Sequence, residues 1–159
     1  MPVRAFRGTG LKLLIQRARR ASVTVEGETI GAIGRGLVIF VCAEPGDSVE
    51  DVDFLARKAI ALRIFSDTEG KMNLALGDID GEILAVSQFT LAARWRKGNR
   101  PGFSDAAPPD EGLALFNRFV ETLRGAGVTV ATGRFGADMQ VELINDGPVT
   151  LWLDGRNPA

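Results

Sequence analysis

The chain has 159 residues and 45% hydrophobic content, which is enough for one domain with a single hydrophobic core. Its 19 lysines and arginines are balanced by 20 acidic residues, so net charge alone does not indicate a nucleic-acid-binding protein. The sequence contains no histidine and one cysteine, which excludes a Ser-His-Asp triad and an internal disulfide and argues against a catalytic zinc site.

The first ten residues differ from the rest of the chain. They hold two arginines and no apolar stretch of signal-peptide length, so we interpret residues 1–10 as a disordered N-terminal extension. Residues 11–159 show no internal repeat, no low-complexity segment and no linker, and we expect them to form one domain. No apolar run is long enough to cross a bilayer, and a lone thiol fits a reducing compartment, so a soluble cytoplasmic protein is expected.

Short runs of apolar and β-branched residues predict strands along most of the domain. The first two runs are expected to pair with each other, and the next two follow across glycine turns at Gly31, Gly34 and Gly36. Cys42 ends the fourth run, where no base or cation would lower its pKa, so we interpret it as a core residue. The predicted strands cover residues 11–17, 22–26, 30–33, 37–42, 82–88, 128–131, 139–144 and 149–153.

Two amphipathic helices are predicted among these strands. Asp47 or Ser48 caps the first helix, and Asp51 stands three residues beyond Ser48, as in a capping box. The second helix is predicted over residues 109–124, and a turn at 67–70 lies between the two helices. Because strands outnumber helices and often follow one another, we expect a mixed α/β domain with helices on one side. The apolar stripes are Val52, Leu55, Ala59 and Leu62 in the first helix and Leu113, Phe116, Phe119, Val120 and Leu123 in the second.

Two motifs stand out against this pattern. Residues 145–150, Asn-Asp-Gly-Pro-Val-Thr, put a glycine and a proline where a strand should run. Proline cannot donate to a sheet ladder and glycine weakens one, so the pair marks a hairpin turn, a bulge or a close backbone approach to a ligand. Residues 87–91, Ser-Gln-Phe-Thr-Leu, follow the apolar run 83–86 at the predicted end of a strand.

With several other ordered segments, these motifs closely resemble the D-aminoacyl-tRNA deacylases over nearly all of residues 11–154. The resemblance implies a β/β/α layered sandwich that works as a homodimer. It also implies hydrolysis of the ester bond of D-aminoacyl-tRNA, which is chiral proofreading in translation. Because a site that works by steric exclusion cannot reject glycine, we expect mischarged glycyl-tRNA to be a substrate as well. No metal or other cofactor is expected. The further segments that carry the resemblance are Gln16-Arg17, Ala21–Val25, Arg63–Phe65, Gly70–Asn73, Arg100-Pro101 and Gly133–Phe135.

The resemblance implies roles for single residues as well. A Gly-cisPro pair, Gly147 and Pro148, enters the pocket of the other subunit and rejects L-amino acids. Arg17 braces this loop, and Asn145 and Thr150 support it. The catalytic pocket is lined by Ser87, Gln88, Phe89 and Thr90.

The hydroxyl of Thr90 has two possible roles. As a nucleophile it would need a base to take its proton, and no nearby sequence group is an obvious candidate. In the alternative, Thr90 makes a local hydrogen bond while backbone N–H groups near Phe89 and Thr90 stabilise the oxyanion of the ester. The resemblance implies that the neighbouring ribose hydroxyl of the tRNA then assists the attack of water, which orientation favours.

A basic loop follows the second motif. Arg94, Arg96, Lys97 and Arg100 put four cations into seven residues, and such a cluster is either a solvated surface or a contact for RNA phosphates. Beside a substrate pocket we interpret it as a contact for the tRNA acceptor end, and expect no DNA or membrane partner. At Arg94 and Trp95 the chain departs from the family, which commonly has an acidic and a small polar residue there.

Two alternatives remain open at this point. One is a noncatalytic tRNA-binding module that uses the basic loop and releases no amino acid. The other is a related deacylase in which the bond between Gly147 and Pro148 is trans and the pocket admits a small L-amino acid.

Overall fold

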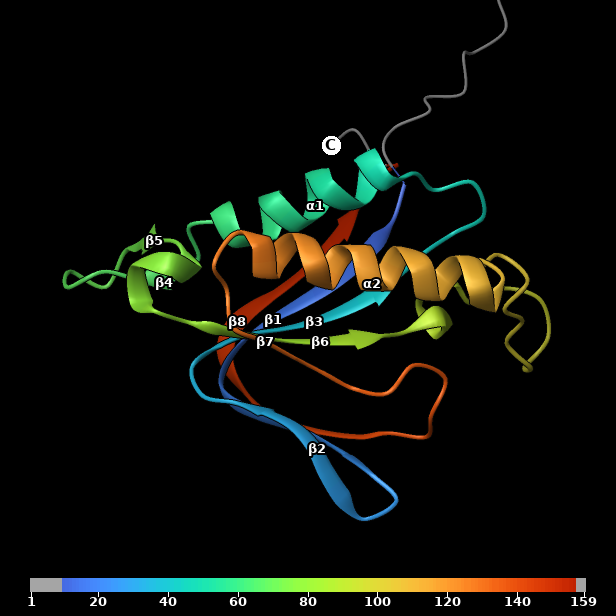
Figure 1. Ribbon diagram of the computed structural model, residues 1–159, viewed down its shortest axis with the longest axis horizontal. Helices are drawn as coiled ribbons and strands as arrows, with labels where there is room; N and C mark the ends of the chain where they lie inside the picture. The colour runs from blue at the N-terminus through green and yellow to red at the C-terminus, as the bar shows by residue number, and fades with distance from the viewer. Residues whose placement is uncertain (1–9, 157–159) are drawn as a thin grey trace, which may run out of the picture.

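A six-stranded sheet with two helices on one face makes up most of residues 10–156, which this computed structural model describes (Figure 1). The predicted mixed α/β class is confirmed, whereas the layered sandwich and the homodimer stay predictions. The strands are β1 (Lys12–Val25), β2 (Glu28–Ile33), β3 (Gly36–Cys42), β4 (Phe65–Ser66), β5 (Met72–Leu74), β6 (Glu82–Ser87), β7 (Val130–Thr132) and β8 (Gln140–Asp154). The helices are α1 (Val49–Ala61) and α2 (Pro109–Gly125), with short 3₁₀ helices η1 (Leu76–Ile79) and η2 (Phe89–Ala92).

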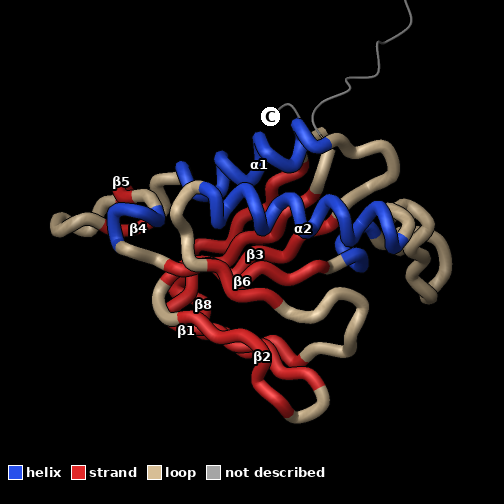
Figure 2. The backbone as a smooth tube through the Cα atoms, in the orientation of Figure 1, coloured by secondary structure: helices blue, strands red, loops and turns tan. Residues whose placement is uncertain are grey.

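The long strand β1 organises the sheet. β8 runs antiparallel along one edge of β1, and the other edge is shared by β3, which pairs with its first half, and β2, which pairs with its second half. β6 lies parallel beside β3, and β7 lies parallel beside β6. Figure 2 shows both helices on the same side of the strands, while β2 and the adjoining half of β1 turn away from them.

The central strand β3 separates two hydrophobic clusters. Leu37 and Ile39 belong to the cluster that the helices cover, together with buried residues of α1 and α2. Val38 belongs to the cluster on the opposite face, with Leu84 and Val86 of β6. A strand buried on both faces needs a continuous apolar run, which explains the sequence Leu-Val-Ile-Phe-Val at this position.

The two strands predicted at residues 11–17 and 22–26 are one strand, β1, and do not pair with each other. The prediction was wrong because Arg17, Arg19 and Arg20 interrupt the apolar alternation. In the structure Arg17 is buried and the other two arginines are exposed, and register shifts against β8 accommodate this stretch. The chain reverses later, in a turn after β1 where Gly27 has a φ of 79°.

Both predicted helices are present. The capping box of α1 is confirmed, since the Ser48 hydroxyl accepts from the Asp51 N–H at 3.2 Å and the Asp51 carboxylate accepts from the Ser48 N–H at 2.9 Å. α2 begins at Pro109 as predicted, but Leu113 is 38% exposed and Leu115 is buried in its place. Within the described residues, neither helix has the length and apolar character that a membrane span requires.

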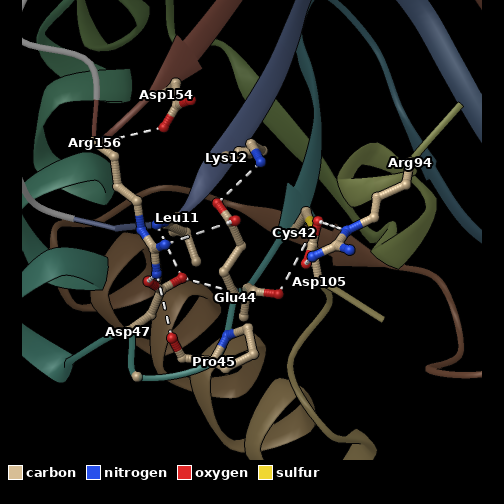
Figure 3. Close-up of polar contacts among 12 residues, drawn as sticks. Leu11, Lys12, Cys42, Glu44, Pro45, Asp47, Arg94, Asp105, Asp154 and Arg156 are labelled. Carbon is tan, nitrogen blue, oxygen red and sulfur yellow. Dashed lines mark hydrogen bonds and ion pairs between the residues drawn. The ribbon is translucent and has the colours of Figure 1, made fainter. Parts of the chain in front are cut away.

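Asp47 ties together the two ends of the described chain (Figure 3). Its carboxylate accepts hydrogen bonds from the N–H groups of Leu11 at 2.9 Å and Glu44 at 2.7 Å, and from the guanidinium of Arg156 at 3.0 Å. The Gly155 N–H donates to the Leu11 carbonyl at 2.9 Å. Apart from Gly10, which is buried, the predicted extension at residues 1–10 lies outside the described residues.

Candidate active site

The Arg17 side chain reaches from β1 to the segment that holds Gly147 and Pro148. Its Nε donates to the Asp146 carbonyl at 3.0 Å, and one terminal nitrogen donates to the Gly147 carbonyl at 3.3 Å. The other terminal nitrogen donates to the Ile64 carbonyl at 2.7 Å, and the arginine is only 7% exposed. One planar, buried guanidinium therefore holds three carbonyl groups in fixed positions.

This segment is a bulge within β8 and not a hairpin turn. Gln16 of β1 pairs with Thr150, and Ala18 pairs with Asn145, so the residues 146–149 lie opposite Arg17 alone. The two strands predicted at 139–144 and 149–153 are thus one strand, because the bulge takes up the glycine and the proline without ending the ladder. The peptide bond between Gly147 and Pro148 is cis, so the alternative with a trans bond does not describe this structure.

Two further predicted site residues close the bulge. The Asn145 amide donates to the Arg17 carbonyl at 2.9 Å and to the Val149 carbonyl at 3.1 Å. The Thr150 hydroxyl donates to the Asn145 side-chain oxygen at 3.4 Å and accepts from the Gln16 amide at 3.3 Å. Asn145 and Thr150 stand at the two ends of the bulge and link them.

Ser87, Gln88, Phe89 and Thr90 lie where β6 ends and η2 begins. The Gln88 N–H donates to the Val41 carbonyl of β3 at 2.8 Å, which fixes the start of this turn. No oxygen of the described residues accepts a hydrogen bond from the backbone N–H of Phe89 or Thr90. The Thr90 hydroxyl accepts from the Gln88 side-chain amide at 2.5 Å, and an amide cannot take the proton of that hydroxyl.

A small cavity of about 30 Å³ borders this turn. It has room for only about two water molecules. Sequence reasoning missed it because its walls come from five separate parts of the chain. Gly112 was the available signal, since glycine inside a helix costs stability and often has a packing reason. The cavity is lined by Val41, Ala43, Ser87, Phe89, Ala107, Gly112, Phe116 and Phe135.

Cys42 lies under the same turn without the character of a nucleophile. It is 1% exposed, and burial raises the pKa of its thiol to about 11. Its sulfur lies 3.7 Å from the carbonyl oxygens of Ala43 and Phe89. The prediction that Cys42 is a core residue is confirmed.

Within one chain, the bulge and the Ser87–Thr90 turn lie far apart. β1 and β3 stand between β8 and β6 in the sheet. Arg17 lies opposite Leu37, and Leu37 lies opposite Ile83, four residues before Ser87 on β6. With strands about 4.8 Å apart and about 3.3 Å per residue, this separation is roughly 20 Å along the sheet. The structure of a single chain does not bring the two motifs together.

The basic loop is joined to the same turn. The ring of Phe103, just after the loop, meets the ring of Phe89 edge to face, with centroids 5.3 Å apart. Arg94 is paired with the Asp105 carboxylate through two hydrogen bonds of 2.6 and 2.7 Å. Among the described residues, Arg96, Lys97 and Arg100 have no ion-pair partner, so these three cations remain available for phosphate contacts.

Comparisons with known proteins agree on one family. The family model described as D-Tyr-tRNA(Tyr) deacylase matches residues 14–154. A D-aminoacyl-tRNA deacylase of Paracoccus denitrificans is 55% identical over 149 residues, which cover 94% of this chain and 100% of that protein. A second, from Ruegeria pomeroyi, is 57% identical and covers 91% of this chain and 99% of its own length.

Solved structures share the fold. The c-Myc DNA Unwinding Element Binding Protein is 42% identical with a TM-score of 0.84, over 93% of this chain and 99% of that one. A probable eukaryotic D-amino acid tRNA deacylase is 20% identical with a TM-score of 0.80, over 91% of this chain and 98% of that one. At that lower identity, the second likeness concerns the fold alone.

Proposed function

Because the chain belongs to the D-Tyr-tRNA(Tyr) deacylase family, we propose that it hydrolyses the ester bond of D-aminoacyl-tRNA. The observation that carries this proposal is the match over residues 14–154, with relatives named D-aminoacyl-tRNA deacylase at 55% and 57% identity. The products are free tRNA and a D-amino acid. Glycyl-tRNA is a substrate as well, since a site that rejects by steric exclusion cannot reject a residue without a side chain. Such an activity proofreads translation, so we expect the protein to act in the cytoplasm.

Catalysis in this proposal rests on the backbone. The N–H groups of Phe89 and Thr90, which have no acceptor among the described residues, stabilise the negative charge that develops on the ester oxygen. The hydroxyl next to the ester on the terminal ribose assists the attacking water, as an intramolecular group that is already oriented. The Thr90 hydroxyl is held by the Gln88 amide and orders the turn.

A second copy of the chain supplies the chiral selector. The roughly 20 Å between Gly147 and Ser87 along the sheet favours a homodimer in which the bulge of one copy enters the pocket of the other. β8 is an edge strand that pairs only with β1 among the described strands, and it exposes 42% of Ile144 and 49% of Trp152. Exposed apolar residues on an unpaired edge are a surface for association. In the pocket, the bulge occupies the space that an L side chain needs, while a D side chain points away.

The basic loop holds the acceptor end of the tRNA. Arg96, Lys97 and Arg100 contact phosphates, which position RNA without reading its sequence. Arg94 is engaged with Asp105, so its part is to shape the loop. We therefore expect little preference among tRNAs in binding.

The experiment compares the rates at which the purified protein releases tyrosine from D-tyrosyl-tRNA and from L-tyrosyl-tRNA, with glycyl-tRNA as a third substrate. We expect release from the D and glycyl esters well above spontaneous hydrolysis, and no acceleration for the L ester. Binding of tRNA without release of any amino acid would contradict the proposal in favour of a noncatalytic tRNA-binding module.

The name of the 42% identical structure supports a second candidate, a DNA-binding role, and the same preparation tests it. A DNA duplex is titrated against the protein under the salt conditions used for tRNA. Binding as tight as that of tRNA would favour this candidate, and we expect weaker binding.

A further inference from the structure

Trp95 is the most exposed large hydrophobic residue among the described residues, with 67% of its surface accessible. It stands in the basic loop, which spans the segment Arg94–Gly102 in the structure. A tryptophan side chain is usually mostly buried, and one left in solvent gains free energy by covering its faces. At this exposure, the described residues leave most of the side chain uncovered.

The basic loop is closed at its base. The N–H of Arg94 donates to the Gly102 carbonyl at 2.7 Å, and the Gly102 N–H donates back at 2.9 Å. The two hydrogen bonds from Arg94 to Asp105 add a second closure, and these lower the pKa of the Asp105 carboxyl. In Figure 3 the two side chains point toward each other. A loop closed in this way loses little conformational entropy when it binds a ligand.

The surroundings of Trp95 combine one cation with an open hollow. The Arg96 guanidinium carbon lies 5.1 Å from the centre of the indole ring, which is the geometry of a cation–π contact. Residues 93–97 line a hollow of about 390 Å³. This volume falls in the range of about 300–1,000 Å³ that is usual for small-ligand sites.

The chemistry of these residues favours a nucleobase over an apolar ligand. Arg96 and Lys97 line the hollow together with Trp95, and Arg100 adds a third positive charge to the same loop. These three cations have no ion-pair partners among the described residues. Aromatic rings among such cations are the usual platform for single-stranded nucleic acid, where the bases stack and the cations follow the phosphates. The contact between Phe103 and Phe89 keeps this platform next to the Ser87–Thr90 turn.

We propose that Trp95 stacks on an unpaired nucleobase at the 3′ end of the tRNA, with Arg96 on the ring beside it. The proposal rests on the proposed function, because it takes the RNA whose ester lies at the Ser87–Thr90 turn as its ligand. Trp95 is then a positioning residue: it holds the single-stranded end near the backbone groups that act on the ester.

The test uses binding of uncharged RNA, so it does not depend on deacylation. The probes are an acceptor-stem hairpin with an unpaired 3′ end and the same hairpin with a blunt end. Trp95→Ala should weaken binding of the first hairpin by roughly 5- to 150-fold, the usual effect of losing one stacked base. Binding of the blunt hairpin should stay unchanged. Trp95→Phe keeps an aromatic face and should restore part of the affinity.

Fluorescence gives a direct second reading. The chain has two tryptophans, so Trp152→Phe leaves Trp95 as the only indole. Its emission should be quenched by the hairpin with the unpaired end and not by the blunt hairpin. Phe54→Ala, which removes a 49% exposed ring from α1, is the matched control and should bind both hairpins like the unmodified protein.

Two outcomes would overturn the inference. Equal affinity of Trp95→Ala and the unmodified protein for the unpaired end would leave the indole without a role in binding. An equal loss for both hairpins would mean that Trp95 only shapes the phosphate-binding loop. If the unmodified protein binds and quenches as expected but cleaves no ester, the proposed function fails while this inference stands.

Discussion

Arg17 and Asp146 are joined twice, once through the backbone and once through the side chains. The Arg17 Nε donates to the Asp146 carbonyl at 3.0 Å and lies 3.3 Å from the Asp146 carboxylate. Arg17 is almost fully buried, so replacing it leaves carbonyl groups of the bulge without a donor in a protected place. The shape of the bulge therefore depends on the fork of the guanidinium.

Arg17→Lys should weaken the rejection of L-aminoacyl-tRNA. Lysine keeps the charge but cannot donate to three carbonyl groups in a plane. We expect a stability loss of about 1–3 kcal/mol from the unmet carbonyl groups and a smaller ratio of D to L cleavage. Denaturant unfolding and the two deacylation rates measure these effects.

Arg20→Lys is the matched control, because it lies three residues further along β1 and pairs with Glu142 on the surface. It should change stability by less than about 0.5 kcal/mol and leave the D to L ratio unaltered. If Arg17→Lys changed stability and the D to L ratio as little as Arg20→Lys, the positive charge of Arg17 would be sufficient and the shape of its guanidinium would not matter.

Thr90→Ala should keep substantial activity. The variant loses the hydrogen bond from Gln88, which corresponds to a decrease of no more than about tenfold in rate. A nucleophile would instead lose several orders of magnitude on truncation. Single-turnover hydrolysis of D-tyrosyl-tRNA distinguishes the two, and complete inactivity of a folded, tRNA-binding variant would make Thr90 the catalyst.

The double variant Arg96→Gln, Lys97→Gln should bind all tRNAs more weakly by a similar factor. Each lost phosphate contact also flattens the dependence of log affinity on log salt by nearly one. Titrations at several salt concentrations check both effects. Arg57→Gln with Lys58→Gln removes the same two charges from the exposed face of α1 and serves as control. If both double variants weakened tRNA binding equally, the effect would come from the net charge of the protein and not from phosphate contacts of the basic loop.

Gly112→Ala should raise stability and lower activity together. A Cβ at this position of α2 would lie 3.6 Å from the Phe135 ring, an ordinary contact that narrows the cavity beside Ser87. The helix should gain about 0.5–1 kcal/mol, and deacylation should fall about tenfold if substrate uses the cavity. Gly125 lies at the end of the same helix, and a Cβ added there would have no atom within 4 Å. Gly125→Ala should therefore raise stability without lowering activity. If kcat/KM of Gly112→Ala were unchanged, the substrate would not use the cavity.

Asp53→Asn should show a stability difference that depends on pH. Hydrogen bonds from Arg118 and Thr122 lower the pKa of the Asp53 carboxyl from 3.8 to about 2. Since the pKa is lower in the folded state, the pair stabilises the fold above about pH 4 and loses this effect as pH falls toward 2. Arg118 is half exposed, so solvent screening limits the difference at pH 7 to about 0.5–1 kcal/mol. The denaturant midpoints of Asp53→Asn and of the unmodified protein should approach each other as the pH is lowered from 7 to 2.5. A difference that stays constant over this range would contradict the lowered pKa of Asp53.

Local patterns predicted the parts of the fold that neighbouring residues determine. The capping box of Ser48 and Asp51 acts over three residues, and the burial of Cys42 follows from its own apolar run. The strand breaks assumed at Arg17 and at Gly147 were wrong for one shared reason. Each residue is accommodated by the other across the β1–β8 ladder, 130 positions apart in the chain, which no window of sequence contains.

The candidate site divides in the same way. The Ser87–Thr90 and Asn145–Thr150 motifs were recognised from the sequence because their residues are contiguous. The pairing of Arg94 with Asp105 joins side chains 11 positions apart in the segment between η2 and α2. The cavity between Gly112 and Phe135 joins parts of the chain that are further apart still, so only the folded chain reveals both features.

The hydrogen bonds of Asp47 to Leu11 and Arg156, called the clasp here, determine how the protein would respond to mechanical force. β1 and β8 run antiparallel as neighbours, and their outer ends, Lys12 and Asp154, face each other next to the clasp. A pull applied at residues 10 and 156 in opposite directions would load the Asp47 contacts first and then open the ladder one pair at a time. This unzipping geometry carries far less load than shearing, in which all the pairs would resist together.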